Sequence, residues 1–363
     1  MMNRIVSDEI YRLIEDETSS FKNFSTTYII ENYKLGVSDL IVRFKSGELQ
    51  ILKNRQLIEE KKIVNVRSRL LAAYVDDAKK KYPEIVNNWD FTIPVCFSDT
   101  SDDPLQEIPC LVFSKTAFST NILMPSPNNL IGHWEVDRVK AFDGPLHTKT
   151  NKLCFIGSLT GNTSAELMPI NMRANVAGKL AGIDNAWCRI LRPPQTPDEY
   201  WNEVLTNLKT VHPDIPEDFI MNQHSKIEIE EQIRHKYQVC VDGHSCAWAR
   251  LPWQMSSNCV PLKVRNPRHN WKEWFYPLLN PNKHFLEVDI EELIPAYNYL
   301  ETNPQAQLDI AEAGKSFVDK YCSPELALDV LVQTLDLLNT KQDNSLISKS
   351  ELEASGQAEI RRV

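Results

Sequence analysis

The sequence predicts an α/β protein made of two doubly wound domains. Strand-like and helix-like patterns alternate in two blocks, which is typical of sheets covered by helices on both faces. A stretch rich in proline, asparagine and glycine, residues 121–149, separates the blocks and predicts a loop and interdomain crossing. We expect an N-terminal domain over 1–145, a C-terminal domain over 146–322, a helix over 323–340 that packs back, and a flexible tail over 341–363.

The first block predicts a hairpin, a helix and two strands. Leu40–Phe44 and Leu49–Leu52 flank a turn at Gly47, a pattern typical of a β-hairpin. Apolar residues recur at helical spacing between about 55 and 81, and Pro83 ends that helix. Strands are predicted over 91–97 and 109–113. Pro94 lies inside the first of them and predicts an edge strand or a bulge.

The second block predicts strands over 152–156, 237–241 and 259–264, and a last strand that ends at Asp289. Five prolines between 192 and 218 predict a loop or a short helix there. Asn303 and Ser323 each precede a proline. A capping residue followed by proline predicts the start of a helix.

Charge and hydrophobicity restrict the class of protein. The net charge of −9 provides no basic field for a polyphosphate chain, so nucleic acid is not an expected partner. The N-terminus lacks the apolar core of a signal peptide, and no apolar run is long enough to span a membrane. We therefore expect a cytoplasmic protein whose eight scattered cysteines are reduced. Peripheral membrane contact stays open, and the oligomeric state is not predicted.

A small-residue turn follows the strand 152–156. Gly157-Ser158-Leu159-Thr160-Gly161 would let backbone N–H groups and hydroxyls approach a phosphate. Cys240, His244 and Cys246 lie close together, but no second cluster has zinc-ligand spacing, so no metal site is expected.

Residues 235–289 carry the most specific signal. They contain a Lys-Tyr strand start, the Asp242-Gly243 turn, Arg250, an apolar helix, a second strand, an aromatic cluster over 271–276 and a Pro-x-x-His piece that ends at His284. This order resembles the CAP10/LpsA-like glycosyltransferases, family 90. The family includes protein O-glucosyltransferases, capsule xylosyltransferases and lipopolysaccharide-modifying enzymes. The resemblance spans about 37–340 and is strongest after 235.

The resemblance implies two Rossmann-like domains that face each other across a cleft, the glycosyltransferase-B architecture. It also implies inverting, metal-independent transfer of glucose or xylose from a UDP-sugar to a hydroxyl of a glycan, lipopolysaccharide or protein. The N-terminal domain would bind the acceptor and the C-terminal domain the nucleotide sugar. No cofactor would be tightly bound, because the UDP-sugar is a substrate.

The resemblance also assigns a donor site. Its residues here are Gly157, Ser158, Thr160, Arg173, Asp242, Gly243, Arg250 and Ser257. Ile156 and Leu159 stand where family members carry arginines. Since a diphosphate needs countercharge, we expect Arg250 and Arg173 to supply it. The alternative for each is an ion pair at the surface or between domains.

On the acceptor side, Asp99 is the candidate general base, by position along the strand that starts at Asp90. The family places this aspartate shortly before a proline. If the match is aligned on Pro104, Asp102 is the candidate base instead. The alternative is a polar loop. Ser114 and Lys115 match the family's Phe-Ser-Lys piece, and would orient the acceptor or only cap a strand.

Aromatic side chains and alternative functions complete the predictions. Trp253, Trp271 and Trp274 would stack on sugars or lie in the core, and a structural role is expected for His284.

The main alternative to a glycosyltransferase is a degenerate family member that binds a glycan or partner without transfer, supported by Ile156 and Leu159. A hydrolase using Asp99 and Asp102 is a third, which requires carboxyls about 5–10 Å apart.

Overall fold

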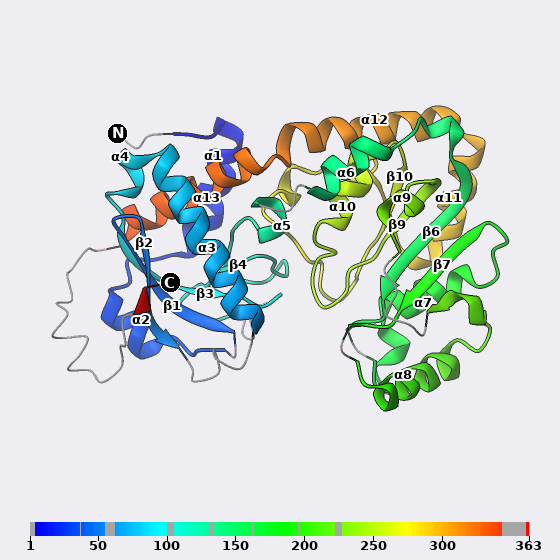
Figure 1. Ribbon diagram of the computed structural model, residues 1–363, viewed down its shortest axis with the longest axis horizontal. Helices are drawn as coiled ribbons and strands as arrows, with labels where there is room; N and C mark the ends of the chain where they lie inside the picture. Colours follow the sequence, from blue (N-terminus) through cyan, green and yellow to red (C-terminus); the bar gives the residue numbers. More distant parts are fainter. Residues whose placement is uncertain are drawn as a thin grey trace. The chain divides into compact units, whose positions relative to one another are not determined.

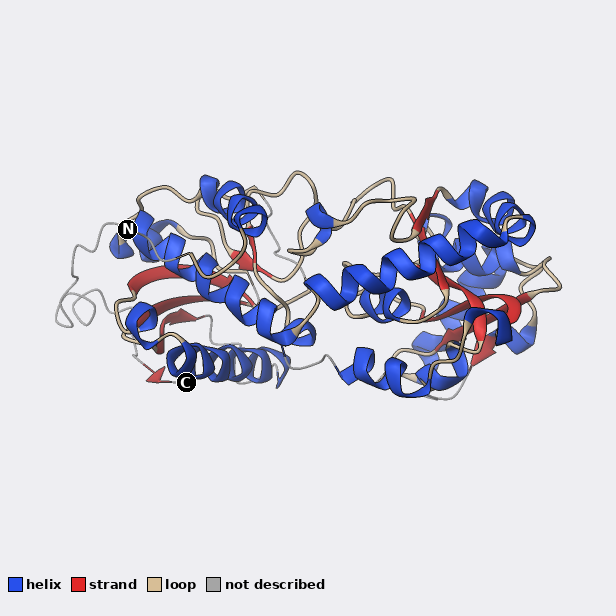
Figure 2. Cartoon of the chain, turned by 90° about the horizontal axis from the view of Figure 1, so that it is seen from above, coloured by secondary structure: helices blue, strands red, loops and turns tan. Residues whose placement is uncertain are grey.

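The computed structural model describes residues 4–36, 38–54, 62–99, 105–130, 134–161, 163–194, 196–221, 227–342 and 361–362. The chain divides into two compact units (Figure 1). Unit 1 comprises 1–132, 271–277 and 323–363. Unit 2 comprises 133–270 and 278–322. Both contain a sheet and helices (Figure 2), so the predicted α/β class is confirmed.

Unit 1 contains a mixed sheet. Its strand order is β12-β2-β1-β3-β4-β5. The bounds are β1 Asp39–Lys45, β2 Glu48–Asn54, β3 Asp90–Cys96, β4 Leu111–Val112, β5 Ile122–Leu123 and β12 Arg361–Arg362. The pairs that involve β1 and β2 are antiparallel, whereas β3, β4 and β5 run parallel. The sheet is mixed because its first two strands form a hairpin, which reverses the chain direction.

The predicted hairpin is confirmed. Ser46 and Gly47 form its turn with φ of 49° and 75°, so both adopt the left-handed conformation that such turns require. The expectation that Pro94 marks an edge strand is wrong, because β3 lies between β1 and β4. Its ladder with β1 is continuous at Pro94, and its pairing with the short β4 is confined to Val95.

The helices of unit 1 come from both ends of the chain. They are α1 Asp8–Glu17, α2 Thr26–Asn32, α3 Lys62–Lys81, α4 Pro83–Val86, α5 Pro127–Leu130 and α13 Pro324–Lys341. The Ser323 side chain accepts a hydrogen bond from the Leu326 N–H and caps α13. This helix packs against α1, α3, α5 and β3, so the predicted return of the C-terminal helix is confirmed. Most of the predicted tail after Gln342 lies outside the described residues.

Unit 2 contains a fully parallel sheet. Its strand order is β11-β10-β9-β6-β7-β8. The bounds are β6 Thr150–Ser158, β7 Ala186–Leu191, β8 Ile220–Met221, β9 His235–Cys240, β10 Val260–Val264 and β11 Leu286–Val288. Counted along this unit, the order is 6-5-4-1-2-3, that of a doubly wound dinucleotide-binding sheet. The strand order reverses between β6 and β9, the switch point at which such sheets bind ligands.

Helices cover both faces of this sheet. They are α6 Trp134–Phe142, α7 Met172–Leu180, α8 Asp198–Val211, α9 Ile229–Gln232, α10 Arg250–Ser256, α11 Leu293–Thr302 and α12 Pro304–Tyr321. Alternate strand residues such as Leu153, Phe155 and Val239 share one core with apolar residues of α7, α8 and α11. On the other face, α10 and α12 contact β10 (Figure 1). The predicted doubly wound fold is therefore confirmed for unit 2.

Two helices of unit 2 correct the predictions. The stretch expected as a loop over 121–149 contains α6, and the proline-rich stretch over 192–218 contains the 14-residue α8. In α8 the buried residues Trp201, Val204 and Leu208 have helical spacing. The prolines border this helix instead of interrupting it, because proline is compatible with the ends of a helix and incompatible with its interior.

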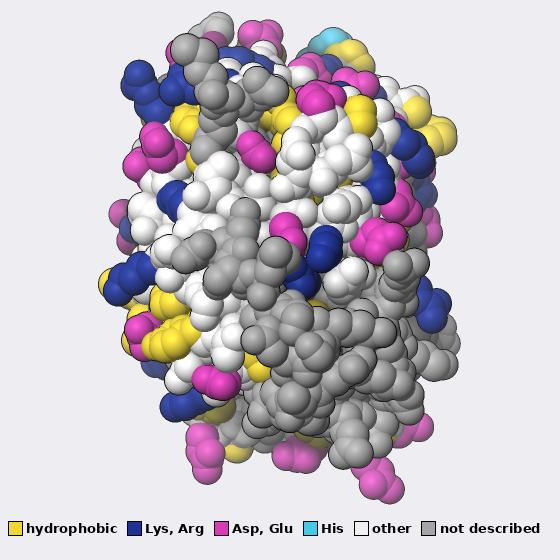
Figure 3. Space-filling model, turned by 90° about the vertical axis from the view of Figure 1, so that its left-hand side faces the viewer, with side chains coloured by type: hydrophobic (Ala, Val, Ile, Leu, Met, Phe, Trp, Pro, Cys, Tyr) yellow, Lys and Arg dark blue, Asp and Glu magenta, His cyan; other side chains and the backbone are white. Residues whose placement is uncertain are grey.

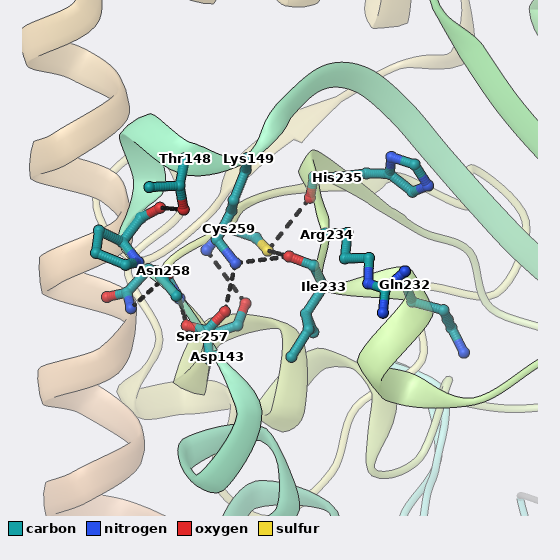
Figure 4. A network of polar contacts seen from close by, with 12 residues as sticks. Asp143, Thr148, Lys149, Gln232, Ile233, Arg234, His235, Ser257, Asn258 and Cys259 are labelled. Carbon is teal, nitrogen blue, oxygen red and sulfur yellow. Dashed lines mark hydrogen bonds and ion pairs between the residues drawn. The ribbon is translucent and has the colours of Figure 1, made fainter.

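A buried polar network lies at the amino ends of β6, β9 and β10 (Figure 4). Lys149 forms an ion pair with Asp143 and donates to the Ile233 carbonyl at 2.6 Å. The second oxygen of Asp143 accepts from the Asn258 N–H at 2.6 Å. Both charged side chains are at most 5% exposed. The network joins α6 to the strand ends, and its charges are paired and hydrogen-bonded, as buried charges require.

The surface and the cysteines complete the description. On the face in Figure 3, the described acidic and basic side chains are interspersed. None of the described helices combines the length and the hydrophobicity needed to cross a membrane.

All eight cysteines are free and buried. Burial raises the pKa of the Cys240 and Cys259 thiols to about 11, so these thiols stay protonated and unreactive at neutral pH.

Candidate functional site

The candidate donor site lies at the switch point of unit 2. The small-residue segment 157–161 comprises the last two residues of β6 and the turn after it, and the Asp242-Gly243 turn follows β9. Since β6 and β9 are parallel neighbours, both turns lie at the carboxyl edge of the sheet. The Gly161 N–H donates to His244 Nε2 at 3.3 Å and links the two turns directly. The two turns that the sequence assigned to one site therefore lie together.

Gly243 lets the two turns approach each other. A Cβ atom at this position would lie 2.8 Å from Nη2 of Arg173 and 2.9 Å from Oγ1 of Thr160. These separations are shorter than van der Waals contact, so a side chain would displace the arginine or the threonine. Gly161, with φ of 91°, adopts the left-handed conformation that favours glycine. The glycines in the two turns are therefore explained by the close approach of one turn to the other and by the left-handed conformation at Gly161.

Arg173 lies at the start of α7, beneath both turns. Its Nη1 donates to the Ser158 carbonyl at 2.7 Å and to Thr160 Oγ1 at 2.9 Å. Asn171 caps α7 by accepting from the Arg173 and Ala174 N–H groups, and its amide donates to the Thr160 carbonyl at 3.1 Å. Burial, together with the neighbouring charge of Arg250, lowers the pKa of Arg173 to about 10. The guanidinium still carries its charge at neutral pH.

Arg250 begins α10 on the other side of β6. Its Nη1 donates to the Ile156 carbonyl, and burial lowers its pKa. Ile156 and Leu159, where the predicted resemblance expected arginines, are 2% and 3% exposed and belong to the interior. The two arginines therefore come from helices, while the strand and turn positions contribute packing.

Asp242 forms its ion pair with Lys263 and not with these arginines. Both its oxygens accept from Lys263 Nζ, at 3.1 and 3.0 Å, and one also accepts from the Ala247 N–H. Burial lowers the pKa of Lys263, but the Asp242 charge outweighs it and the net shift is upward. Within the described ranges, neither Arg173 nor Arg250 forms an ion pair. The turns are thus bordered by two cations whose charge is not matched by a paired carboxylate.

Ser257 lies apart from this group. It follows the last residue of α10, whereas Arg250 begins that helix. Its buried hydroxyl donates to the Gln254 carbonyl at 2.6 Å and accepts from the Cys259 N–H at 3.2 Å. These bonds close the turn before β10, at the amino edge of the sheet. The structure brings together the other seven predicted donor residues.

Asp99 of unit 1 is held by neighbouring groups. Its carboxylate accepts from Arg67 at 3.0 Å, its carbonyl accepts from Ser114 Oγ at 2.7 Å, and its side chain is 37% exposed. Arg67 also donates to the Phe97 carbonyl at 2.7 Å. The arrangement presents an ordered carboxylate at the end of β3. Asp102 lies outside the described residues, so the choice between the two acids and the two-acid hydrolase both stay hypotheses.

Lys115 is engaged within unit 1. Its ammonium pairs with Glu17 and donates to the Asn121 carbonyl at 2.7 Å. Its backbone N–H bonds to the Lys272 carbonyl. Lys115 therefore links α1 and two loops, and Ser114 contacts the candidate base instead.

The aromatic candidates are interior residues. Trp253, Trp271 and Trp274 are 5%, 9% and 8% exposed, so the core alternative is confirmed. His284 accepts from the Asn280 N–H at 3.0 Å and packs on the Phe317 ring, as its predicted structural role requires.

Sequence reasoning missed three residues of the candidate donor site. His244 joins the turns, Lys263 neutralises Asp242, and Asn171 positions Arg173. The signal for His244 was its place directly after Asp242-Gly243. Lys263 ends a buried strand, where a lysine requires a charged partner. The described residues contain no group of three or more histidine, cysteine or acidic side chains able to hold a metal ion.

A carboxyl-edge site with two arginines is typical of domains that bind nucleotides or their sugars. Residues 193–338 match the sequence model of glycosyl transferase family 90. The family resemblance predicted from the sequence is confirmed over this segment. The segment contains the Asp242-Gly243 turn, His244, Arg250 and Lys263.

Two curated viral proteins are similar to the chain. It is 34% identical to the uncharacterized protein 179R of invertebrate iridescent virus 6 over 113 residues, which are 30% of this chain and 9% of that protein. It is 24% identical to the uncharacterized protein 035R of invertebrate iridescent virus 3 over 322 residues, 82% of this chain and 27% of that one. The chain thus spans under a third of either relative.

Solved structures with partial similarity were also found. A sucrose-phosphate synthase from Thermosynechococcus elongatus shares 11% identity over 57% of this chain and 47% of that chain, with a TM-score of 0.35. A glycosyltransferase from Rickettsia africae shares 15% identity over 52% and 48%, with a TM-score of 0.36. The C-terminal domain of a group 1 glycosyl transferase from Francisella tularensis shares 12% identity over 55% and 96%, with a TM-score of 0.33.

Proposed function

We propose that the protein is an inverting glycosyltransferase that moves glucose or xylose from a UDP-sugar to a hydroxyl of a glycan, lipopolysaccharide or protein. The observation that carries the proposal is the pair Arg173 and Arg250 at the switch point of unit 2, with Asp242 already neutralised by Lys263. Two cations without a paired carboxylate, next to glycine-rich turns, favour a diphosphate. The family match over 193–338 supports glycosyl transfer as the reaction class.

In this proposal the two arginines beside the turns bind the diphosphate. As the bond between the anomeric carbon and the diphosphate oxygen breaks, the electron pair leaves with UDP. Cations held in place beforehand next to this oxygen would stabilise the growing charge. Lys263 contributes indirectly, because it prevents Asp242 from repelling the anion or capturing an arginine.

Asp99 would take the proton of the acceptor hydroxyl as its oxygen attacks the anomeric carbon from the opposite face. The Arg67 guanidinium, 3.0 Å from the Asp99 carboxylate, holds that carboxylate in place. Ser114 fixes the backbone at Asp99 and so orients the side chain.

A non-catalytic glycan- or partner-binding module is the second candidate. The buried Ile156 and Leu159 favour it, since they remove two countercharges from the donor site. The engagement of Lys115 with Glu17 also removes a candidate acceptor contact.

Thermal unfolding in the presence of UDP, UDP-glucose and UDP-xylose tests donor binding, with ADP-glucose as a comparison. A ligand at about 100 times its Kd should stabilise the protein by about 2.7 kcal/mol. We expect the uridine nucleotides to stabilise the wild type and not Arg250→Ala. Arg234→Ala is the matched control, because Arg234 is an exposed arginine of the same unit at the amino end of β9 (Figure 4). Stabilisation by no nucleotide would overturn the proposal.

Asp99→Asn separates the two candidates. Asparagine keeps the shape of aspartate and cannot accept the acceptor proton. The variant should bind UDP-glucose with unchanged affinity. Its rate of UDP formation by transfer should be about 10²- to 10⁴-fold lower than that of wild type. If the wild type is folded but binds no uridine nucleotide, as the missing countercharges at Ile156 and Leu159 predict, the binding module is favoured.

A further inference from the structure

His244 bridges the two turns of the candidate donor site. It is an exposed residue directly after Gly243, and its Nε2 accepts the Gly161 N–H at 3.3 Å. An imidazole nitrogen accepts a hydrogen bond only when it carries no proton. The bond therefore belongs to the neutral ring, with the proton on Nδ1. In this form His244 occupies one backbone donor of a turn that is suited to bind an anion.

Protonation would reverse the role of the ring. With both nitrogens protonated, Nε2 becomes a donor and can no longer accept from Gly161. Gly161 has φ of 91°, and its N–H belongs to a turn between a strand and α7. Release of this N–H and the new positive charge act in the same direction, since both favour an anion between the turns.

The charged groups around His244 come from every element that meets there. Arg173 comes from α7 and lies within 3 Å of the position that a Gly243 side chain would take. Arg250 comes from α10. Asp242, from the turn itself, is paired with Lys263 of β10. The surroundings are thus net positive, which suits an anion bound between the turns.

We propose that His244 binds the diphosphate of the donor as an imidazolium, so that binding of the donor is coupled to uptake of a proton. This inference rests on the proposed function, because it assigns a further residue to the same donor site. An anion bound against the ring stabilises the protonated form. By linkage, the affinity for the donor then rises as pH falls through the range in which imidazole titrates, roughly pH 8 to 5. At high pH the neutral ring keeps its bond to Gly161, and this part of the affinity is lost.

The test is isothermal titration calorimetry of the full chain with UDP-glucose at about pH 5.5 and about pH 8.5. Both phosphates of UDP-glucose are diesters, so they lack the second ionisation that a phosphate monoester shows at about pH 6. A pH dependence therefore reports the protein. Since a charge-assisted hydrogen bond contributes about 1.5–3 kcal/mol, wild-type affinity should be about tenfold or more higher at the lower pH.

His244→Gln is the informative variant. The glutamine carbonyl can still accept from Gly161, but the side chain cannot become a cation. Its affinity should match that of wild type at the higher pH and change little with pH. His147→Gln is the matched control, because His147 is an exposed histidine of the same unit in the connection before β6. This control should keep the wild-type pH dependence. Proton uptake on binding, measured in buffers of different ionisation enthalpy, should disappear only in His244→Gln.

The outcomes separate the inference from the proposed function. If wild type binds UDP-glucose and His244→Gln shows the same pH dependence and proton uptake, the inference is overturned while the donor site stands. If wild-type affinity does not change with pH, the inference is also overturned. If wild type binds no uridine nucleotide at either pH, the proposed function itself fails.

Discussion

Gly243 illustrates how a single backbone position controls the proposed donor site. A methyl group there would collide with Arg173 and Thr160. Its φ is not in the left-handed region, so alanine would fit the backbone and act only through this collision. We predict that Gly243→Ala displaces the arginine and weakens UDP-glucose binding by about tenfold or more, the effect of losing one charge-assisted contact.

Gly182→Ala provides the control for this prediction. A Cβ atom at Gly182 meets no heavy atom within 4 Å, so donor affinity should stay at the wild-type value. Calorimetric titration of both variants, with thermal unfolding to confirm that each is folded, checks the prediction. Unchanged affinity in a folded Gly243→Ala protein would contradict the role given to Arg173.

Single residues show where the sequence alone is informative and where it is not. Arg173 and Arg250 could be assigned to one site because the family resemblance places an arginine at each of these positions. Ser257 was assigned by the same reasoning and lies at the other end of α10. Motif order along the chain does not state at which edge of the sheet a residue lies. Lys115 likewise fits a motif, but its partner Glu17 is 98 residues away in sequence.

At the level of elements, the Asp143–Lys149 pair holds the start of β6 to the end of α6 (Figure 4). We predict that Lys149→Met lowers the free energy of unfolding of unit 2 by about 3–5 kcal/mol. Removal of the lysine leaves a buried, uncompensated carboxylate. Chemical denaturation, followed by a probe in unit 2, measures this loss.

Lys140→Met is the matched control within the same region. Lys140 forms an ion pair with Asp319, but both side chains are well exposed, at 39% and 50%. Exposed pairs contribute about 0–1 kcal/mol, so this variant should be almost as stable as wild type. If Lys149→Met lowers the free energy of unfolding as little as Lys140→Met does, the Asp143 network does not stabilise the fold.

Elements were predictable where the local pattern decides the structure. The hairpin at Gly47 and the helix starts at Pro304 and Pro324 follow from turn and proline chemistry. The cap at Asn303 does not, since its side chain donates to the Tyr299 carbonyl and leaves the start of α12 uncapped by a side chain. The helix α8 was missed because its flanking prolines hid an ordinary helical repeat.

On the scale of the whole molecule, the two units should respond differently to the donor. We predict that UDP-glucose slows amide hydrogen exchange in residues 157–161, 171–175 and 242–250 of unit 2. The strands β1 and β3 of unit 1 should exchange at the same rate with and without the nucleotide. Binding stabilises the groups it contacts, and local opening is measured by exchange.

Hydrogen exchange followed by mass spectrometry checks this prediction on the intact chain. Arg250→Ala is the control, because the protection should disappear when donor binding is lost. Protection confined to unit 1 would show that the donor does not bind at the switch point and would contradict the assignment of the site.

The global arrangement could be predicted only in part, since the mixed sheet of unit 1 depends on pairings between strands far apart in sequence.

The return of α13 to unit 1 has a consequence for the order in which the protein is made. Unit 1 takes residues from the beginning of the chain and from 323 onward. Val332, Leu335 and Leu338 of α13 are fully buried, so this unit has no complete core without them. A ribosome releases the chain from its N-terminal end. Unit 2 can therefore fold first during synthesis, while the first 130 residues cannot complete their core until α13 has been synthesised.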